Sequence, residues 1–114
     1  MLDKRKLKEK CKVYFELFSK KDLDGLSHFF SDEIVLRDWE IFATGKAEVL
    51  KANKNIFDNV KKIQVKLNDQ SFSQNNKVYN EIVIEIDDVE TLLVIDVIEF
   101  DKNGLIKKIE AYKG

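Results

Sequence analysis

One ionisable residue, Asp96, interrupts the apolar run 92–98 within the stretch Glu90–Phe100, which reads ETLLVIDVIEF. Because side chains alternate across a strand, Asp96 would share its face with Leu92, Val94, Ile98 and Phe100, and the opposite face would carry Leu93, Ile95, Val97 and Glu99, so both faces are largely apolar. A strand that is apolar on both faces is expected to be covered on both, so a carboxyl in its middle must find a hydrogen-bond partner, stay protonated or line a cavity. Asp96 is therefore either the centre of a site or a carboxyl held by a buried donor with no further role.

A second carboxyl has a similar setting in residues 33–39, EIVLRDW, where the residues again alternate. Asp38 falls on the face that carries Ile34 and Leu36, and Trp39 falls on the other face. The chain thus has two carboxyls on separate predicted strands, each among apolar neighbours.

Other kinds of site find little support. The single His28 and the single Cys11 lie far apart in the chain, which argues against a metal site with nitrogen and sulfur ligands. None of the four glycines belongs to a phosphate-binding loop, and no nucleophile-elbow sequence supports a catalytic triad with His28. We therefore expect neither a metal nor a cofactor.

Composition sets the class of protein. The chain has 114 residues, of which 44% are hydrophobic and 36% are charged, as expected for one globular domain spanning residues 1–114. A net charge of −1 predicts no binding to nucleic acid, and the lysine-rich start, KRKLKEKCK, fits the solvated face of a helix. No apolar run follows that start and none reaches 18 residues, so we expect a soluble, cytoplasmic protein without membrane contacts.

Periodicity predicts three helices ahead of the long strands. Residues 3–20 indicate a helix with an apolar stripe, residues 23–30 a short helix capped by Asp22, and Thr44 an N-cap for a helix that reaches residue 60. The stripe of the first helix consists of Leu7, Cys11, Val13, Tyr14, Leu17 and Phe18, and the inner surface of the third consists of Val49, Leu50, Asn53 and Phe57.

From residue 61 onward the apolar period changes to two. Four strands are predicted in a row, at residues 61–72, 77–87, 90–100 and 105–113, separated by clusters of turn-forming residues. Strands joined by short turns form an antiparallel meander, and helices segregated from such a sheet define an α+β fold. Three helices that cover one face of a curved sheet can leave a pocket between helices and sheet.

The second face of strand 90–100 has no helix left to cover it. Leu93, Ile95 and Val97 lie on this face, and Leu105 or Tyr112 would lie nearby on the last strand. A second copy of the chain is the economical cover, so we expect a homodimer through the sheet.

Two segments carry a resemblance to known enzymes. Residues 14–38, YFELFSKKDLDGLSHFFSDEIVLRD, are similar to the start of the ketosteroid isomerases, above all in DLDGL and FFSDEIVLRD. VIDVIEF, residues 94–100, resembles the isomerase strand that carries an acidic oxyanion-hole residue. These isomerases belong to the nuclear transport factor 2-like superfamily, which includes the SnoaL-type polyketide cyclases, and the order of predicted elements resembles the cone-shaped fold of that superfamily.

The resemblance implies roles for three residues. Asp38 matches the general base, and Tyr14 and Asp96 match the hydrogen-bond donors to the oxyanion, so the implied chemistry is proton transfer next to a carbonyl. The implied ligand is a small apolar or carbonyl-containing molecule in a pocket lined by Phe18, Trp39, Phe57, Val94, Ile98, Ile109 and Ala111.

The same residues are compatible with two other functions: a non-catalytic module that binds a ligand, and a dimerisation module with a residual pocket. Trp39 and Glu40 follow Asp38 directly and would narrow the pocket mouth, unless Trp39 belongs to an interface. On strand 77–87, either the face with Asn80 or the face with Glu81 would line the pocket. Cyclase-like and dehydratase-like reactions, both found in the superfamily, are alternatives to isomerisation.

Overall fold

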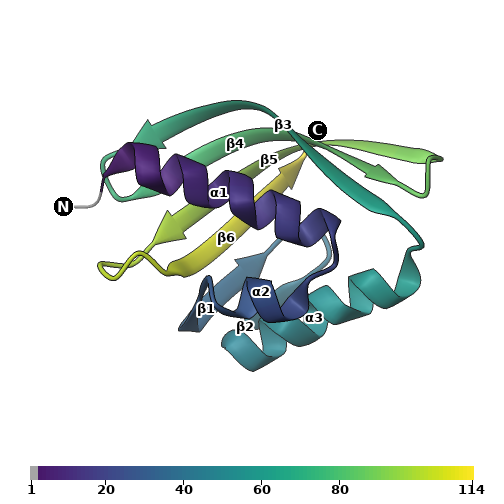
Figure 1. Cartoon of the computed structure of the whole chain (residues 1–114), viewed down its shortest axis with the longest axis horizontal. Coiled ribbons are helices and arrows are strands. Elements are labelled where there is room, and N and C mark those ends of the chain that lie inside the picture. Colours follow the sequence, from purple (N-terminus) through teal and green to yellow (C-terminus); the bar gives the residue numbers. More distant parts are fainter. Residues whose placement is uncertain (1–2) are drawn as a thin grey trace.

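The first helix begins where the side chain of Asp3 accepts a hydrogen bond of 2.9 Å from the backbone N–H of Arg5. In the computed structural model, which describes residues 3–114, this helix, α1 (Lys4–Ser19), lies across the sheet (Figure 1). Met1 and Leu2 of the predicted single domain lie outside the described residues. The residues that α1 buries are Leu7, Cys11, Tyr14 and Phe15. Val13, predicted on the buried stripe, is instead exposed, because it lies two positions from both Cys11 and Phe15, and residues two apart on a helix do not share a face.

The second helix is shorter than its sequence pattern. As predicted, the side chain of Asp22 caps α2 (Leu23–Ser27) by accepting a hydrogen bond from the Gly25 N–H at 2.9 Å. The helix ends before Phe30 because that residue pairs with Ile106 and begins strand β1 (Phe30–Arg37). Pairing with a strand far away in the sequence thus overrides a local helical pattern.

The third helix, α3 (Lys46–Asn59), begins without a side-chain cap. Thr44, the predicted N-cap, is instead the last residue of a short strand, β2 (Phe42–Thr44), and pairs with Val35 of β1. Gly45 stands at the cap position with a φ of 87°, which only glycine adopts at little cost. Its N–H donates to the carbonyl of Ile34 at 2.7 Å, which ties the start of α3 to β1.

The long strands confirm the predicted meander. They are β3 (Ile63–Ser73), β4 (Lys77–Ile86), β5 (Glu90–Phe100) and β6 (Ile106–Lys113), and each is antiparallel to the next. The full strand order is β2-β1-β6-β5-β4-β3. Because β1 pairs with β6 in parallel, the sheet is mixed at this one position and antiparallel elsewhere.

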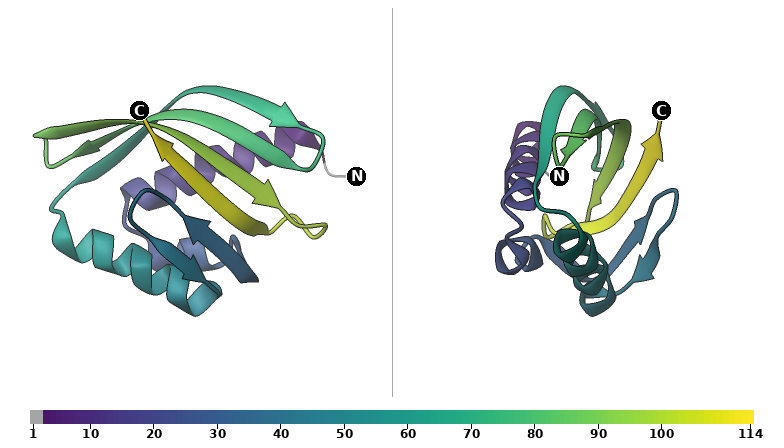
Figure 2. Two further views of the ribbon diagram at one scale, coloured as in Figure 1. Left: turned by 180° about the vertical axis from the view of Figure 1, so that it is seen from behind. Right: turned by 90° about the vertical axis from the view of Figure 1, so that its right-hand side faces the viewer.

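The curved sheet has its helices on one side only (Figure 2). The inner side holds one buried apolar cluster to which α1, α3 and the sheet contribute. The outer side exposes Tyr79, Leu93, Ile95 and Tyr112 by 39%, 61%, 39% and 56%. Within the chain, the outer face of β5 is therefore uncovered at Leu93 and Ile95, whereas Val97 on the same face is buried.

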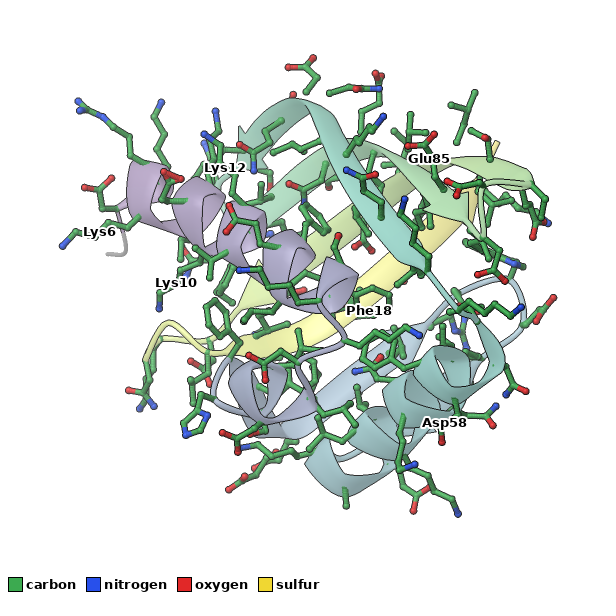
Figure 3. All side chains as sticks on the ribbon, turned by 45° about the vertical axis from the view of Figure 1, so that its right-hand side comes forward. Lys6, Lys10, Lys12, Phe18, Asp58 and Glu85 are labelled. Carbon is green, nitrogen blue, oxygen red and sulfur yellow. The ribbon has the colours of Figure 1, made fainter. Side chains whose placement is uncertain are left out.

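The basic start of the chain lies on the solvated side of α1, as predicted. The side chains of Lys6 and Lys12 point away from the molecule, whereas Phe18 points inward, toward α3 (Figure 3). Among residues 3–114, no helix has the length and apolar character needed to cross a membrane.

Candidate functional site

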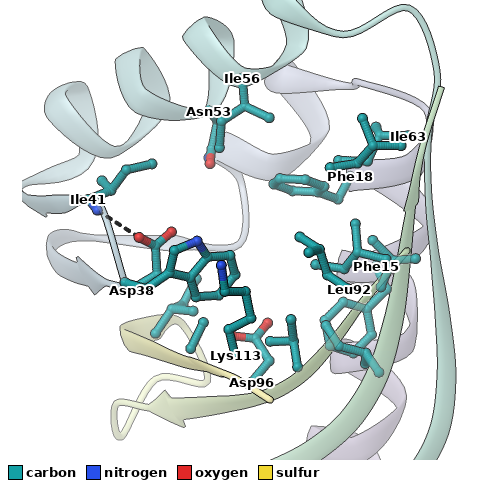
Figure 4. Close-up of a pocket in the computed structure, with 18 of the residues that line it drawn as sticks. Phe15, Phe18, Asp38, Ile41, Asn53, Ile56, Ile63, Leu92, Asp96 and Lys113 are labelled. Carbon is teal, nitrogen blue, oxygen red and sulfur yellow. Dashed lines mark hydrogen bonds between the residues drawn. The ribbon is translucent and has the colours of Figure 1, made fainter. Parts of the chain in front are cut away.

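A cavity of about 320 Å³ lies between α1, α3 and the inner face of the sheet (Figure 4). Its volume is at the lower end of the range for small-molecule pockets. Tyr14, Asp38 and Asp96, three residues from separate parts of the chain, all contribute to its wall. The apolar part of the wall contains Phe18, Val94, Ile109 and Ala111, as expected, together with Phe15, Leu36, Ile82, Ile84 and Leu92. The face of β4 that carries Asn80 and Ile82 is thus the inner one.

Two residues predicted to line the cavity lie outside its wall. Phe57 is buried behind Phe18, with the two ring centroids 4.8 Å apart in an edge-on arrangement. Ile98 shares the inner face of β5 with Asp96 but is fully buried in the apolar cluster. Trp39, by contrast, contributes to the wall and remains 39% exposed, as expected for a residue at the pocket mouth.

Asp96 is held in the middle of β5, opposite Asn80 of β4 and Ala111 of β6. Its side chain is only 6% exposed and faces the cavity. Burial, and to a smaller degree the charge of Asp38, raises the pKa of Asp96 from 3.8 to about 7. Near neutral pH this carboxyl therefore spends much of its time protonated, and in that form it can donate a hydrogen bond to a ligand.

Tyr14 reaches the same cavity from α1. Its ring packs among three other aromatic rings, those of Phe15, Phe18 and Phe30, at centroid distances of 5.4, 6.1 and 6.2 Å. Burial, followed by the nearby Asp96 and Cys11, raises the pKa of Tyr14 well above 10. The phenol thus keeps its proton and is a second potential donor beside Asp96.

Asp38 follows the end of β1 and is fixed by the backbone of its own turn. Its Oδ1 accepts hydrogen bonds from the N–H groups of Glu40 at 2.7 Å and Ile41 at 2.6 Å, the second of which is drawn in Figure 4. A turn of this type, in which an Asp side chain bonds the backbone that follows it, orients the carboxylate. It leaves Oδ2 available to a molecule in the cavity.

Sequence reasoning missed Glu90, the first residue of β5, and two further polar residues of the wall. Lys113 pairs with Val94 across β5 and β6, and its Nζ lies 5.4 Å from the centroid of the Trp39 ring. Alternation along β6 was a usable signal, since Ile109, Ala111 and Lys113 fall on one face. The other is Asn53 of α3, which is 2% exposed. Its signal was a polar side chain on the predicted inner surface of that helix.

The charges of the wall are unbalanced. Four carboxyl groups, of Asp38, Glu40, Glu90 and Asp96, line the cavity together with one ammonium group, that of Lys113. An anionic ligand would meet repulsion from the carboxylates, so the wall disfavours an acid.

The chemistry of the remaining reactive groups is restricted. Among residues 3–114, no group of three or more His, Cys, Asp or Glu side chains is arranged to hold a metal ion. Burial raises the pKa of Cys11 to about 12, so its thiol stays protonated and unreactive.

The fold and the site together define a class of domain, namely an α+β cone with a partly enclosed cavity. The SnoaL-like domain family matches residues 12–109, and the chain belongs to that family. No curated protein matches the sequence significantly.

Solved structures confirm the nuclear transport factor 2-like fold. An NTF2-like protein of unknown function from Cytophaga hutchinsonii is similar with a TM-score of 0.78 at 11% identity, covering 100% of this chain and 92% of the other. A protein of unknown function with a cystatin-like fold from Methylobium petroleophilum has a TM-score of 0.86 at 15% identity, with 99% and 78% covered. SalBIII, an epoxide hydrolase/cyclase-like enzyme in pyran ring formation of the polyether salinomycin, has a TM-score of 0.81 at 17% identity, with 100% and 95% covered.

Proposed function

We propose that the cavity binds a neutral, mainly apolar molecule with a carbonyl group and that Asp38 transfers a proton at the carbon beside this carbonyl. The observation that carries the proposal is the position of Tyr14, Asp38 and Asp96 in one wall, with burial favouring the protonated forms of Tyr14 and Asp96. The assignment of roles is taken from the ketosteroid isomerases that the sequence resembles.

The proposed reaction uses each of the three groups once. Asp38 removes the proton through Oδ2, and the electron pair of the broken C–H bond moves toward the carbonyl oxygen. Tyr14 and protonated Asp96 donate hydrogen bonds to that oxygen as it gains negative charge. Asp38 then returns the proton to another carbon of the unsaturated enolate, which shifts the double bond and restores the carboxylate.

The rest of the wall supports a ligand of this kind. Its aromatic and aliphatic side chains, among them Phe18, Val94 and Leu92, offer an apolar surface, and the excess of carboxyl groups disfavours an acid. Proton transfer next to a carbonyl needs no charge on the substrate, so the chemistry and the electrostatics of the wall agree.

The test is a fluorescence titration with equilenin, a phenolic steroid that mimics the enolate. We expect saturable binding by the wild type, stronger binding by Asp38→Asn because a negative charge leaves the cavity, and binding at least about tenfold weaker for Asp96→Leu. The exposed Asp24→Asn is the control and should bind like the wild type. Affinity should also fall as the pH rises through about 7, where Asp96 loses its proton.

Absence of equilenin binding to the wild type would contradict the proposal. Tight binding without turnover of a β,γ-unsaturated ketosteroid would identify a binding module, in which Asp38 orients the ligand and moves no proton.

The outer face of the sheet supports a homodimer as the working form. Ile95 of β5 lies opposite Tyr112 of β6, so exposed apolar surface is continuous across these two strands, and Tyr79 of β4 adds to it beside the exposed Glu81. A twofold axis through this face would cover the same side chains on both copies.

A further inference from the structure

Asn53 carries a buried polar atom that the fold does not satisfy. The side chain is 2% exposed, and its Nδ2 is the one buried side-chain nitrogen or oxygen among residues 3–114 without a hydrogen-bond partner. Leaving a buried donor unpaired destabilises a protein, and most native buried polar groups are paired.

Another buried amide in the same structure shows the usual arrangement. Asn80 is fully buried, and its Nδ2 donates to the backbone carbonyl of Asp96 at 2.9 Å. Its Oδ1 accepts from Nε2 of Gln70 at 2.9 Å. The fold thus provides hydrogen-bond partners for the side-chain amide of Asn80 and none for Nδ2 of Asn53 on α3.

Asn53 is placed to act on a bound molecule. It belongs to the cavity wall, and its side chain points into the cavity from α3, whereas Asp96 points into it from the sheet on the other side (Figure 4). The same wall includes the apolar side chains of Phe18, Ile56 and Leu92. The amide oxygen faces the cavity and Nδ2 is buried beside it (Figure 4); since no partner holds Nδ2, a half-turn about the last side-chain bond turns the NH₂ group to the cavity instead.

We propose that Asn53 binds a second oxygen function of the ligand, at the end of the cavity opposite Tyr14 and Asp96. The inference rests on the proposed function and specifies its substrate class, which is an apolar skeleton with one carbonyl at the reacting end and a second carbonyl or hydroxyl at the far end. In this arrangement the ligand supplies the partner that the fold withholds from Asn53. Asn53 acts as a specificity-determining residue and takes no part in the proton transfer.

The test compares two probes that differ in one group. Equilenin has a phenol at one end and a ketone at the other, and the matched probe has a CH₂ group in place of the ketone. We expect the wild type to bind equilenin at least about tenfold more tightly than the matched probe, because a site built to bond a polar group discriminates against the analogue that lacks it. Asn53→Leu should remove this preference, and Asp96→Leu should weaken both probes equally.

Thermal unfolding separates a binding role from a structural one. Asn53→Leu should melt at the same temperature as the wild type or higher, since an unpaired buried amide is replaced by an apolar group of similar size. Asn80→Leu, the matched variant of a satisfied amide, should melt lower than the wild type. A melting temperature of Asn53→Leu reduced as far as that of Asn80→Leu would overturn the inference.

The two proposals fail in different ways. If the wild type binds both probes with equal affinity and Asp96→Leu weakens the binding of both, the role of Asn53 is overturned and the proposed function stands. This comparison needs no variant of Asn53. Absence of binding of either probe would contradict the proposed function and, with it, the role of Asn53.

Discussion

Two aspartates in one cavity have different surroundings and therefore different chemistry. Asp96 lies in the middle of a covered strand, where burial favours the neutral carboxyl. Asp38 lies in a turn, half-buried, where two backbone N–H groups bond one of its oxygens. Such different surroundings suit one carboxyl group to act as an acid and the other to act as a base in one site.

The raised pKa of Asp96 predicts a pH dependence of stability. The folded protein holds this proton up to about pH 7, whereas the unfolded chain releases it near 3.8. The stability that Asp96 contributes is therefore fully present below its pKa in the unfolded chain and is lost as the pH rises through its pKa in the folded protein. The loss is on the order of 4 kcal/mol.

Asp96→Asn keeps the shape of the side chain and removes its ionisation. In urea unfolding at pH 8, the variant should exceed the wild type in free energy of unfolding by about 2–4 kcal/mol, and the difference should shrink toward pH 4. The exposed Glu33→Gln serves as the control and should follow the wild-type curve. Parallel curves for Asp96→Asn and the wild type would show that Asp96 is ionised at neutral pH.

At the scale of elements, one lysine joins the two helices that border the cavity. Lys21 follows α1 with a φ of 57°, and its Nζ donates to the backbone carbonyls of Phe57, Val60 and Lys61 at the end of α3. The carbonyls of Phe57 and Val60 are among those that a helix end leaves without partners, Lys61 lies just beyond it, and a cation there also opposes the negative end of the helix dipole. Because α1 carries Tyr14 and α3 carries Asn53, this contact helps to set the width of the cavity.

Lys21→Met should destabilise the protein by about 1–3 kcal/mol, since it removes charge-assisted hydrogen bonds and keeps the apolar stem. Urea unfolding measures this difference, with the exposed neighbour Lys20→Met as the matched control. We also expect weaker equilenin binding by Lys21→Met at temperatures where it is fully folded. Equal stabilities of the two variants would show that the contact adds nothing.

At the scale of the whole molecule, the sheet has one face that the chain covers and one that it does not. The uncovered face carries exposed apolar side chains on three neighbouring strands, including Tyr79, Leu93, Ile95 and Tyr112. Apolar patches of this kind on a soluble protein usually mark an interface.

Size-exclusion chromatography with light scattering should therefore give twice the chain mass of 13.3 kDa. Ile95→Lys places a charge in the centre of the patch and should yield the monomer. Val89→Lys adds the same charge at an exposed position in the turn between β4 and β5 and should leave the dimer intact. A wild type that elutes as a stable 13.3 kDa monomer would exclude the dimer.

Local patterns were sufficient for the long strands and for the inner position of Asp96. Alternation is a property of a few consecutive residues, and it predicts β5 at Glu90–Phe100 with the bounds that the structure shows. The same alternation places Val94, Asp96, Ile98 and Phe100 on one buried face. The roles implied for Tyr14 and Asp38 came from the resemblance, and their positions in one wall agree with it.

Contacts between distant segments decided the remaining features. Phe30 joins a strand because Ile106 is beside it, and Thr44 joins one because Val35 is beside it, so neither position followed its local signal. The missing partner of Asn53 depends on every group that surrounds it in three dimensions. Sequence alone thus determined what repeats locally, the strands and the face of Asp96, whereas tertiary structure decided which groups meet across the cavity, because those meetings depend on pairing and packing over long sequence separations.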